Sequence, residues 1–366
     1  MKLNEINEIL FMEFKTVLKD FQKKIESRIT SFLDERINEA AEIKSEAKEL
    51  LENIKEYNLR GGKRLRAAFC VQGFKAVGGA DEEAILDAAV SLELLQSFLI
   101  IHDDIMDEDS FRRGGKAFHK IYEDVAVKRF PEVNSSRFGE NVGIIAGDLL
   151  QSFGIEALIH SDFPTETKFE ALKKLNEIIY YTSFGQIFDL LNECRKNPSQ
   201  EDVMLTHTYK TAFYTVSGPL QLGAILGEAS EKQLTVLNNY GIPLGQAFQL
   251  QDDILGIYGS EEKLGKPADS DLKEGKQTLL IVKAMEKGNE KQKKKIRQAL
   301  GNRNLSREEA EEARKIIIET GSLDYSKKLI EELIEEAKKA LNEADFNEEG
   351  KNFLLGVADY MLSREY

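Results

Sequence analysis

Apolar residues recur at three- and four-residue spacing along almost the whole chain, and no convincing run of alternating apolar and polar positions indicates a strand. Segments containing glycine or proline interrupt this helical pattern. Because such segments end helices, we expect helix boundaries there. These segments are Tyr57–Gly62, Val77–Gly79, Arg112–Gly115, Asn197–Pro198 and Gly265–Pro267. The pattern therefore predicts an all-α protein.

The expected organisation is a single helical domain over residues 1–366, because neither a Gly/Ser-rich linker nor a repeat of fixed period divides the chain. Residues 1–45 form an N-terminal helical extension of unknown role. Residues 286–366 are charged helices of the same domain, with Lys and Glu at the spacing of solvated helix faces. Ser199-x-x-Asp202 has the pattern of a capping box and predicts a helix start.

Composition narrows the functional classes. Of the 366 residues, 42% are hydrophobic and 31% are charged, which is ordinary for a globular protein. No apolar run approaches the roughly 20 residues that span a bilayer, and the N-terminus lacks a signal-peptide core. We therefore expect a cytoplasmic protein with no transmembrane segment. The formal net charge of −14 gives no general attraction to nucleic acid, and Cys70 and Cys194 are too few for a disulfide framework.

A first acidic cluster follows the apolar segment Leu92–Ile101 and contains Asp103, Asp104 and Asp107. Acids at a helix C-terminus are disfavoured by about 0.3–1 kcal/mol each, so folding gains nothing from them. Asp103 and Asp107 lie one turn apart on one face, with Asp104 about 100° around the helix. Such carboxylates suit Mg²⁺, which completes its shell with water and phosphate. A solvated helix end is the alternative, but Gln96 on the same stripe favours a site.

A second cluster repeats this arrangement. Gln246, Gln249 and Asp253 share one face of an apolar segment that ends in Asp252-Asp253. Two Asp pairs, each ending an apolar helix with Gln on its inner face, predict two facing clusters that hold several Mg²⁺ ions around one diphosphate. The ions would act as Lewis acids for the departing pyrophosphate and would orient it.

Basic segments alternate with the acidic ones. In Gly61-Gly62-Lys63-Arg64-Leu65-Arg66 a turn joins a helix start, where backbone N–H groups and cations both favour phosphate. Arg112-Arg113 follows the first cluster, Lys266 and Lys276 follow the second, and Lys210 lies between them. Each alone is compatible with a surface cation. Together they predict two diphosphate subsites, one bridged by metal and the other held by Lys and Arg alone.

These motifs make the chain resemble the trans-isoprenyl diphosphate synthases (polyprenyl synthetases) over approximately residues 50 to 300. The motifs are Gly61-Gly62-Lys63-Arg64-x-Arg66, Asp103-Asp104-x-x-Asp107, Arg112-Arg113-Gly114, Gly185-Gln186-x-x-Asp189, Lys210-Thr211, Gln249-x-x-Asp252-Asp253 and Gly265-Lys266-Pro267. The resemblance implies an isoprenoid-synthase-type bundle of antiparallel helices around a deep central cavity, usually as a homodimer. It also implies head-to-tail condensation of isopentenyl diphosphate with dimethylallyl, geranyl or farnesyl diphosphate.

The resemblance further implies a role for each matching residue. Metal binding falls to Asp103, Asp104, Asp107 and Asp252, with Asp253 in support. The allylic diphosphate would be held by Arg112, Lys210, Gln249, Lys266 and Lys276. Isopentenyl diphosphate would be held by Gly62, Lys63, Arg66, Gln96 and Arg113. Gln186, Asp189 and Thr211 would line the reacting centre. Many members carry a third Asp where this chain has Gly256, so metal binding at the second cluster is expected to be thinner rather than lost.

Product length is expected to depend on residues beneath the first cluster. Phe98 lies five residues before Asp103, about 7.5 Å along the helix axis, Leu99 lies directly beneath Asp103, and Leu95 lies one turn beyond. An aromatic at this position typically limits members of the family to short products, so we expect geranylgeranyl diphosphate, or farnesyl diphosphate. His102 is a candidate base, but the released pyrophosphate is better placed to take the proton.

Two other readings stay open. A terpene cyclase or head-to-head synthase shares this fold but generally needs no second subsite for isopentenyl diphosphate, so the paired Arg112-Arg113 counts against it. A non-catalytic regulatory subunit tends to lose acids from its clusters, whereas this chain keeps both Asp pairs.

Overall fold

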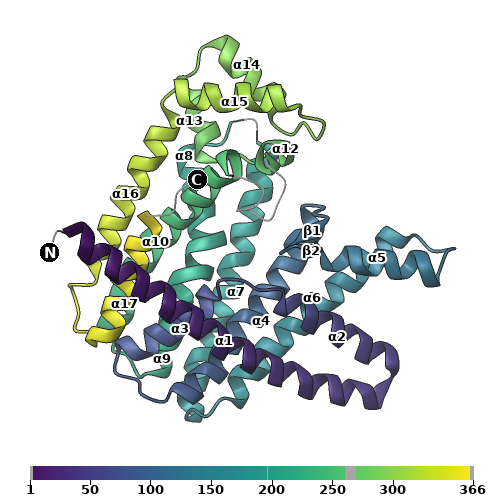
Figure 1. Ribbon diagram of the computed structural model, residues 1–366, viewed down its shortest axis with the longest axis vertical. Coiled ribbons are helices and arrows are strands. Elements are labelled where there is room, and N and C mark those ends of the chain that lie inside the picture. The colour runs from purple at the N-terminus through teal and green to yellow at the C-terminus, as the bar shows by residue number, and fades with distance from the viewer. Residues whose placement is uncertain (1–2, 196, 260–268, 363–366) are drawn as a thin grey trace. The chain divides into compact units, whose positions relative to one another are not determined.

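The computed structural model describes residues 3–195, 197–259 and 269–362. Over these ranges the regular secondary structure is helical apart from one hairpin of two-residue strands, so the all-α prediction is confirmed (Figure 1). The elements are α1 (Leu3–Ile43), α2 (Ser45–Leu59), α3 (Leu65–Ala76), α4 (Glu82–Met106), β1 (Phe111–Arg112), β2 (Gly115–Lys116), α5 (Phe118–Arg129), α6 (Ser135–His160), α7 (Thr165–Cys194), α8 (Gln200–Thr206), the π-helix η1 (His207–Ser217), α9 (Gly218–Leu226), α10 (Glu231–Tyr258), α12 (Ser270–Glu274), α13 (Leu279–Lys287), α14 (Glu290–Ala299), α15 (Arg307–Glu319), α16 (Ser322–Ala340) and α17 (Glu348–Leu362).

The helix boundaries follow the predicted punctuation. α2 ends just before the glycine pair of Gly61-Gly62, and α3 ends just before Gly78. The capping box at the start of α8 is confirmed, because the Ser199 hydroxyl accepts from the Asp202 N–H while the Asp202 carboxylate accepts from the Ser199 N–H. The predicted break at Gly265–Pro267 lies outside the described residues.

The chain divides into two compact units, which we describe separately. One unit comprises residues 15–71 and 80–172 and is called the α4 unit. The other comprises residues 1–14, 72–79 and 173–366 and is called the α10 unit. A single domain over residues 1–366 stays a prediction.

In the α4 unit, α4 packs against α6, and α5 packs against α6 and α4. Glycines on α6 allow this close approach: a Cβ at Gly147 would stand 2.2 Å from His102 Nε2 of α4. The prediction that no apolar run approaches the length of a membrane span is wrong, because α4 and α6 are each long and apolar enough to cross a bilayer by length and composition. Of the apolar windows, 78% is buried in the protein for α4 and 44% for α6. The apolar run of α4 is therefore the core of its unit.

In the α10 unit, α10 packs against η1, α9 and α16, and α16 also contacts α13, α15 and α17. The charged C-terminal helices carry exposed ion pairs at helical spacing, such as Lys328–Glu332 at 3.5 Å. This confirms that their Lys and Glu residues lie on solvated faces, where each pair contributes little to stability.

Candidate active site

The first acidic cluster forms the last turn of α4. Asp104 is fully buried, whereas Asp103 and Asp107 are half-buried. Asp104 Oδ2 accepts from the Tyr57 hydroxyl at 3.1 Å, and Oδ1 accepts from Nε and Nη2 of Arg112, the former at 2.7 Å. Burial raises the pKa of Asp104 above its ordinary value, and the Arg112 guanidinium opposes that rise. Asp104 is thus held by protein partners on both of its oxygens.

Arg112 and Arg113 have different partners because Arg112 ends strand β1, whereas Arg113 lies in the turn of the β1–β2 hairpin. The register pairs Arg112 with Gly115, which leaves Arg113 and Gly114 as a two-residue turn. Both have positive φ, +50° and +73°, as a type I′ turn requires. Arg112 Nη2 donates to Asp109 at 2.8 Å as well as to Asp104. The guanidinium of Arg113 instead lies against Gly62, with Cζ 3.4 Å from where a Cβ would stand.

A second group in the same unit collects the cations predicted to hold isopentenyl diphosphate. With the Gln96 amide oriented to match its neighbours, Oε1 accepts from Arg66 Nη1 at 3.0 Å and from Arg113 Nη2 at 3.2 Å. The amide therefore draws together two guanidinium groups that would otherwise repel each other. Gly62 lies next to the Arg113 guanidinium, and Lys63 follows Gly62 in the loop. The structure brings together residues that are 30 and 17 positions away from Gln96 in sequence.

Arg64, to which sequence reasoning assigned no role, anchors this loop from below. It is 2% exposed and has a positive φ of +51°. Its Nη1 donates to the fully buried Glu93 carboxylate at 3.2 Å, and its Nη2 donates to the Asn58 carbonyl at 2.6 Å. A buried cation costs several kcal/mol unless it is paired in this way. The acid Glu93 within the apolar run of α4 is the signal that could have revealed this pair.

The second acidic cluster lies on α10 in the other unit. The prediction that Asp252-Asp253 ends its helix is wrong, because α10 continues for five residues beyond Asp253. Asp253 is buried and Asp252 is half-buried, which repeats the order seen in the first pair. Asp253 Oδ1 accepts from Gln249 Nε2 at 2.8 Å, and Gln249 Oε1 accepts from the Thr211 hydroxyl at 2.7 Å. The buried His207, which sequence reasoning missed, places Nε2 3.2 Å from Asp253 Oδ2.

The π-helix η1 carries Lys210 and Thr211 between α7 and α10. A Cβ at Gly185 of α7 would stand 2.1 Å from the Lys210 backbone nitrogen, and one at Gly245 of α10 would stand 2.4 Å from the Ala212 Cα. Both helices therefore approach the η1 backbone closely because they have glycine there. Lys210 Nζ donates to Asp189 of α7 at 2.5 Å. π-helical turns inside helical segments are frequent at functional sites.

Gly256 of α10 lies next to an acidic residue of α12, Asp271. A Cβ at this position would stand 2.1 Å from Asp271 Oδ2, so the Asp271 carboxylate occupies the space next to Gly256. Lys276, two residues after α12, forms an ion pair with Glu274 at 2.8 Å. Lys266 lies outside the described residues. Gln186 is half-buried on α7, one turn before Asp189.

The donor chemistry of both clusters fits Mg²⁺. Within the described ranges, no three or more His, Cys, Asp or Glu residues form a ready-made metal cage. Mg²⁺ does not need one, because it commonly takes one or two carboxylates and fills its shell with water and substrate phosphate. The half-buried carboxylates of Asp103, Asp107 and Asp252 are oxygen donors of this kind.

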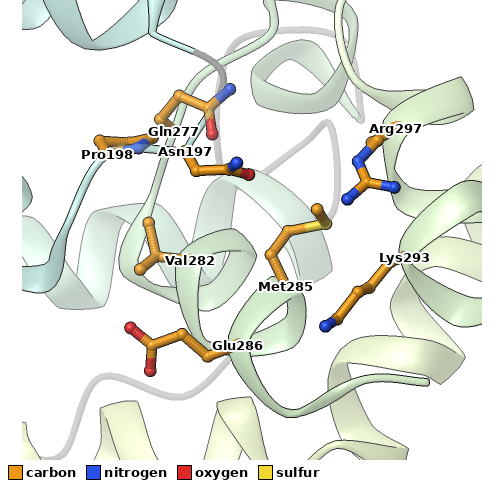
Figure 2. A pocket seen from close by; sticks show the side chains of 8 residues that line it. All are labelled: Asn197, Pro198, Gln277, Val282, Met285, Glu286, Lys293 and Arg297. Carbon is orange, nitrogen blue, oxygen red and sulfur yellow. The ribbon is translucent and has the colours of Figure 1, made fainter. Parts of the chain in front are cut away.

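A separate pocket of about 250 Å³ lies in the α10 unit, between α13, α14 and the segment before α8 (Figure 2). It is lined by Asn197, Pro198, Gln277, Val282, Met285, Glu286, Lys293 and Arg297. None of the predicted site residues lines this pocket, so the pocket is not part of the candidate active site.

Comparison with known proteins decides the family. The polyprenyl synthetase family model matches residues 48–317. The chain belongs to this family. Geranylgeranyl diphosphate synthase from Methanosarcina mazei is 36% identical over 306 residues, 84% of this chain and 87% of that protein. Geranylgeranyl pyrophosphate synthase from Geoglobus acetivorans is 32% identical over 350 residues, 96% of this chain and 99% of that protein.

The solved structures agree. Geranylgeranyl pyrophosphate synthase from Corynebacterium glutamicum, crystallised with isoprenyl diphosphate and magnesium, matches with a TM-score of 0.91 and 31% identity over 95% of this chain and 99% of that one. The predictions of an isoprenoid-synthase fold and of a trans-prenyltransferase are confirmed. The family uses divalent metal ions and acts on isoprenyl diphosphates.

Proposed function

We propose that this polyprenyl synthetase condenses isopentenyl diphosphate head to tail with an allylic diphosphate and that geranylgeranyl diphosphate is its main product. The observation that carries this proposal is the cation group around Gln96, where Arg66 and Arg113 meet at one amide oxygen. A diphosphate is the ligand whose charge such a pair of guanidinium groups complements. The printed names of the relatives support the product.

The residues divide into those that contact substrate and those that hold them. Asp103, Asp107 and Asp252 are the proposed Mg²⁺ ligands, with several ions per site. When bound, the metal supplies positive charge that stabilises the departing pyrophosphate. Asp104 and Asp253 are proposed to act chiefly by fixing their neighbours, since protein groups approach both oxygens of each carboxylate.

The basic side chains, together with Gln249, would bind the two diphosphate substrates. Lys63, Arg66 and Arg113 would bind and orient isopentenyl diphosphate so that its double bond meets the allylic carbon. The allylic diphosphate is assigned to Lys210, Gln249, Lys276 and Arg112, together with Lys266. Charge fixed in advance at the leaving group would supply most of the rate acceleration. The proton lost in the last step would pass to the released pyrophosphate.

His102 is proposed to support packing rather than to act as the base. Its ring meets that of Phe98 edge to face at 4.9 Å between centroids, and its Nε2 lies 3.0 Å from the Ile144 carbonyl oxygen. Phe98 and Leu95 are buried and Leu99 is half-buried. We propose Phe98, held by His102, as the floor that limits chain growth. Phe98→Ala should therefore shift the product toward longer chains, and unchanged product length would contradict this assignment.

The decisive experiment is a turnover assay on the purified protein with Mg²⁺ and labelled isopentenyl diphosphate. Dimethylallyl, geranyl and farnesyl diphosphates would be offered separately and the products sized by chromatography. A labelled twenty-carbon product supports the proposal, and a fifteen-carbon product would replace the assigned chain length. No product from folded protein with any primer would favour a non-catalytic regulatory subunit.

We also propose a cytoplasmic homodimer. Large apolar side chains lie exposed on one face of α7 at helical spacing, namely Tyr180, Phe184, Ile187 and Leu191, each between 44% and 53% exposed. Such a stripe is typical of a surface covered by a partner. Light scattering coupled to size-exclusion chromatography should give the mass of two chains, and Phe184→Glu should shift it to that of one. A monomeric wild-type protein would contradict the proposal.

A further inference from the structure

The N-terminal helix α1 contacts the loop that carries the cations for isopentenyl diphosphate. Gln22 Nε2 donates to the Gly62 carbonyl at 3.2 Å. Glu26 Oε1 accepts from both Nε and Nη2 of Arg64, each at 3.2 Å. Gln22 and Glu26 are four residues apart and therefore lie on one face of α1. Their two contacts fall on either side of Lys63 in the sequence.

The loop needs such support because its backbone is unusual. Gly61, Gly62 and Arg64 all have positive φ, at +93°, +133° and +51°. A non-glycine residue at positive φ is held there by its surroundings at a cost of about 1–3 kcal/mol. Arg64 is held by the Glu93 carboxylate and the Asn58 carbonyl from beneath, and Glu26 completes its set of acceptors.

α1 is itself fixed firmly enough to act as a support. Ile25 and Ile29, on either side of Glu26, are fully buried. Ion pairs from α1 to the start of α4 join Lys24 to Glu82 at 2.5 Å and Arg28 to Asp87 at 3.4 Å. The buried Ile25 and Ile29 therefore fix this segment of α1, to which the exposed Lys24–Glu82 pair adds little, and Gln22 and Glu26 of the same segment contact the loop.

We propose that Gln22 and Glu26 are positioning residues for isopentenyl diphosphate: they hold the Gly61–Arg66 loop so that Lys63 and Arg66 stay in place for the diphosphate. This gives part of the N-terminal extension a role in substrate affinity. The inference rests on the proposed function, because it concerns the subsite for one of the two substrates. It requires no contact between α1 and the substrate itself.

The test is a comparison of Michaelis constants in the full-length protein. Glu26→Ala and Gln22→Ala should each raise the KM for isopentenyl diphosphate, by about tenfold for Glu26→Ala, because this variant removes two charge-assisted hydrogen bonds that hold Arg64 in the loop. The KM for the allylic diphosphate should stay within about twofold. Glu26→Gln, which keeps an acceptor oxygen without the charge, should restore part of the affinity.

Lys24→Ala is the matched control, since it removes an ion pair of the same helix turn that does not involve the loop. Isopentenyl diphosphate alone has no allylic partner to react with, so its dissociation constant can also be measured directly by calorimetry on each variant. Thermal unfolding would report any general loss of stability.

The outcomes separate the two proposals. A raised KM and dissociation constant for isopentenyl diphosphate in the Gln22 and Glu26 variants alone would support the positioning role. Equal changes in both Michaelis constants, or the same changes in Lys24→Ala, would overturn it and leave α1 a purely structural helix. Lack of product from wild type and Lys24→Ala would overturn the proposed function, while the calorimetry would still decide whether α1 governs binding of this diphosphate.

Discussion

The two Asp pairs lie at different distances from the ends of their helices, two residues before the end of α4 and five before the end of α10, and are held by different chemistry. In the α4 unit, the buried Asp104 is bound by the charged guanidinium of Arg112 and by the Tyr57 hydroxyl. In the α10 unit, the buried Asp253 is bound by the Gln249 amide and approached by the His207 imidazole. In both pairs the first Asp is half-buried and the second is buried.

The motif determines which of the two carboxylates is buried, and the surrounding elements determine which groups bind it. The exposure of the two carboxylates follows from helix geometry, because adjacent residues point about 100° apart. The partners of Asp104 come from other elements, β1 and α2, whereas Asp253 is held by Gln249 of its own helix and approached by His207 of η1. The hydrogen bonds from the Arg112 guanidinium to Asp104 are charge-assisted on both sides and are therefore stronger than the one from the neutral Gln249 amide to Asp253.

The largest effect should come from truncating the buried Asp of each pair. Asp104→Ala and Asp253→Ala should each lower turnover by on the order of 10²-fold or more, because Arg112 and Gln249 are then no longer held in place for the leaving diphosphate. Their stabilities should differ. Asp104→Ala leaves the Arg112 guanidinium poorly paired and should lower the free energy of unfolding by about 3 kcal/mol, whereas Asp253→Ala should cost about 1–2 kcal/mol.

Urea unfolding of the two variants measures this difference. Asp124→Ala is a suitable control in the α4 unit, because its exposed ion pair with Lys116 should contribute less than about 1 kcal/mol. Equal losses of stability in Asp104→Ala and Asp253→Ala would show that the charge of the partner does not matter. Near-normal turnover in Asp104→Ala would contradict the role assigned to the first cluster.

An effect on activity of intermediate size is expected from Gly256→Asp, because only the first cluster has a third acid on its own helix end. The first cluster has Asp107 on its own chain segment, whereas the second has Gly256 with Asp271 beside it. Gly256→Asp, which introduces the acid common in the family, should therefore reduce rather than raise activity, by about tenfold. The new side chain would displace the Asp271 carboxylate, and the two carboxylates at one place would repel each other.

The double variant Gly256→Asp with Asp271→Gly tests the cause of that loss. It removes the repulsion and moves a carboxylate from α12 to α10, so it should be more active than Gly256→Asp alone. Asp271→Gly alone serves as the control. Full activity of Gly256→Asp in a steady-state assay would contradict the close approach of Asp271.

Local features were readable from the sequence, and contacts between distant segments were not. The helix ends at Leu59 and Ala76 and the capping box at Ser199 followed from residues within a few positions. The roles of the predicted site residues stay predictions. The contacts Tyr57–Asp104 and His207–Asp253 join positions 47 and 46 residues apart, for which a single sequence carries no spacing rule. The π-helical turns of η1 also escaped notice, because one wide stretch hardly alters the apolar periodicity.

The smallest effect should come from the neutral end of the second network. Thr211→Val keeps the shape of the side chain but removes the hydroxyl that donates to Gln249, so the Gln249–Asp253 contact loses its far support. Specificity for the allylic diphosphate, kcat/KM, should fall about fivefold, which corresponds to about 1 kcal/mol for one neutral hydrogen bond. Thr208→Val is the matched control on η1, because Thr208 accepts from Gln246 and not from Gln249. If both variants lost the same activity, the chain from Thr211 to Asp253 would have no special part in holding the second cluster. If only Thr211→Val did, the neutral hydrogen bonds from Thr211 through Gln249 would help to position a carboxylate whose counterpart in the first cluster is held by a guanidinium.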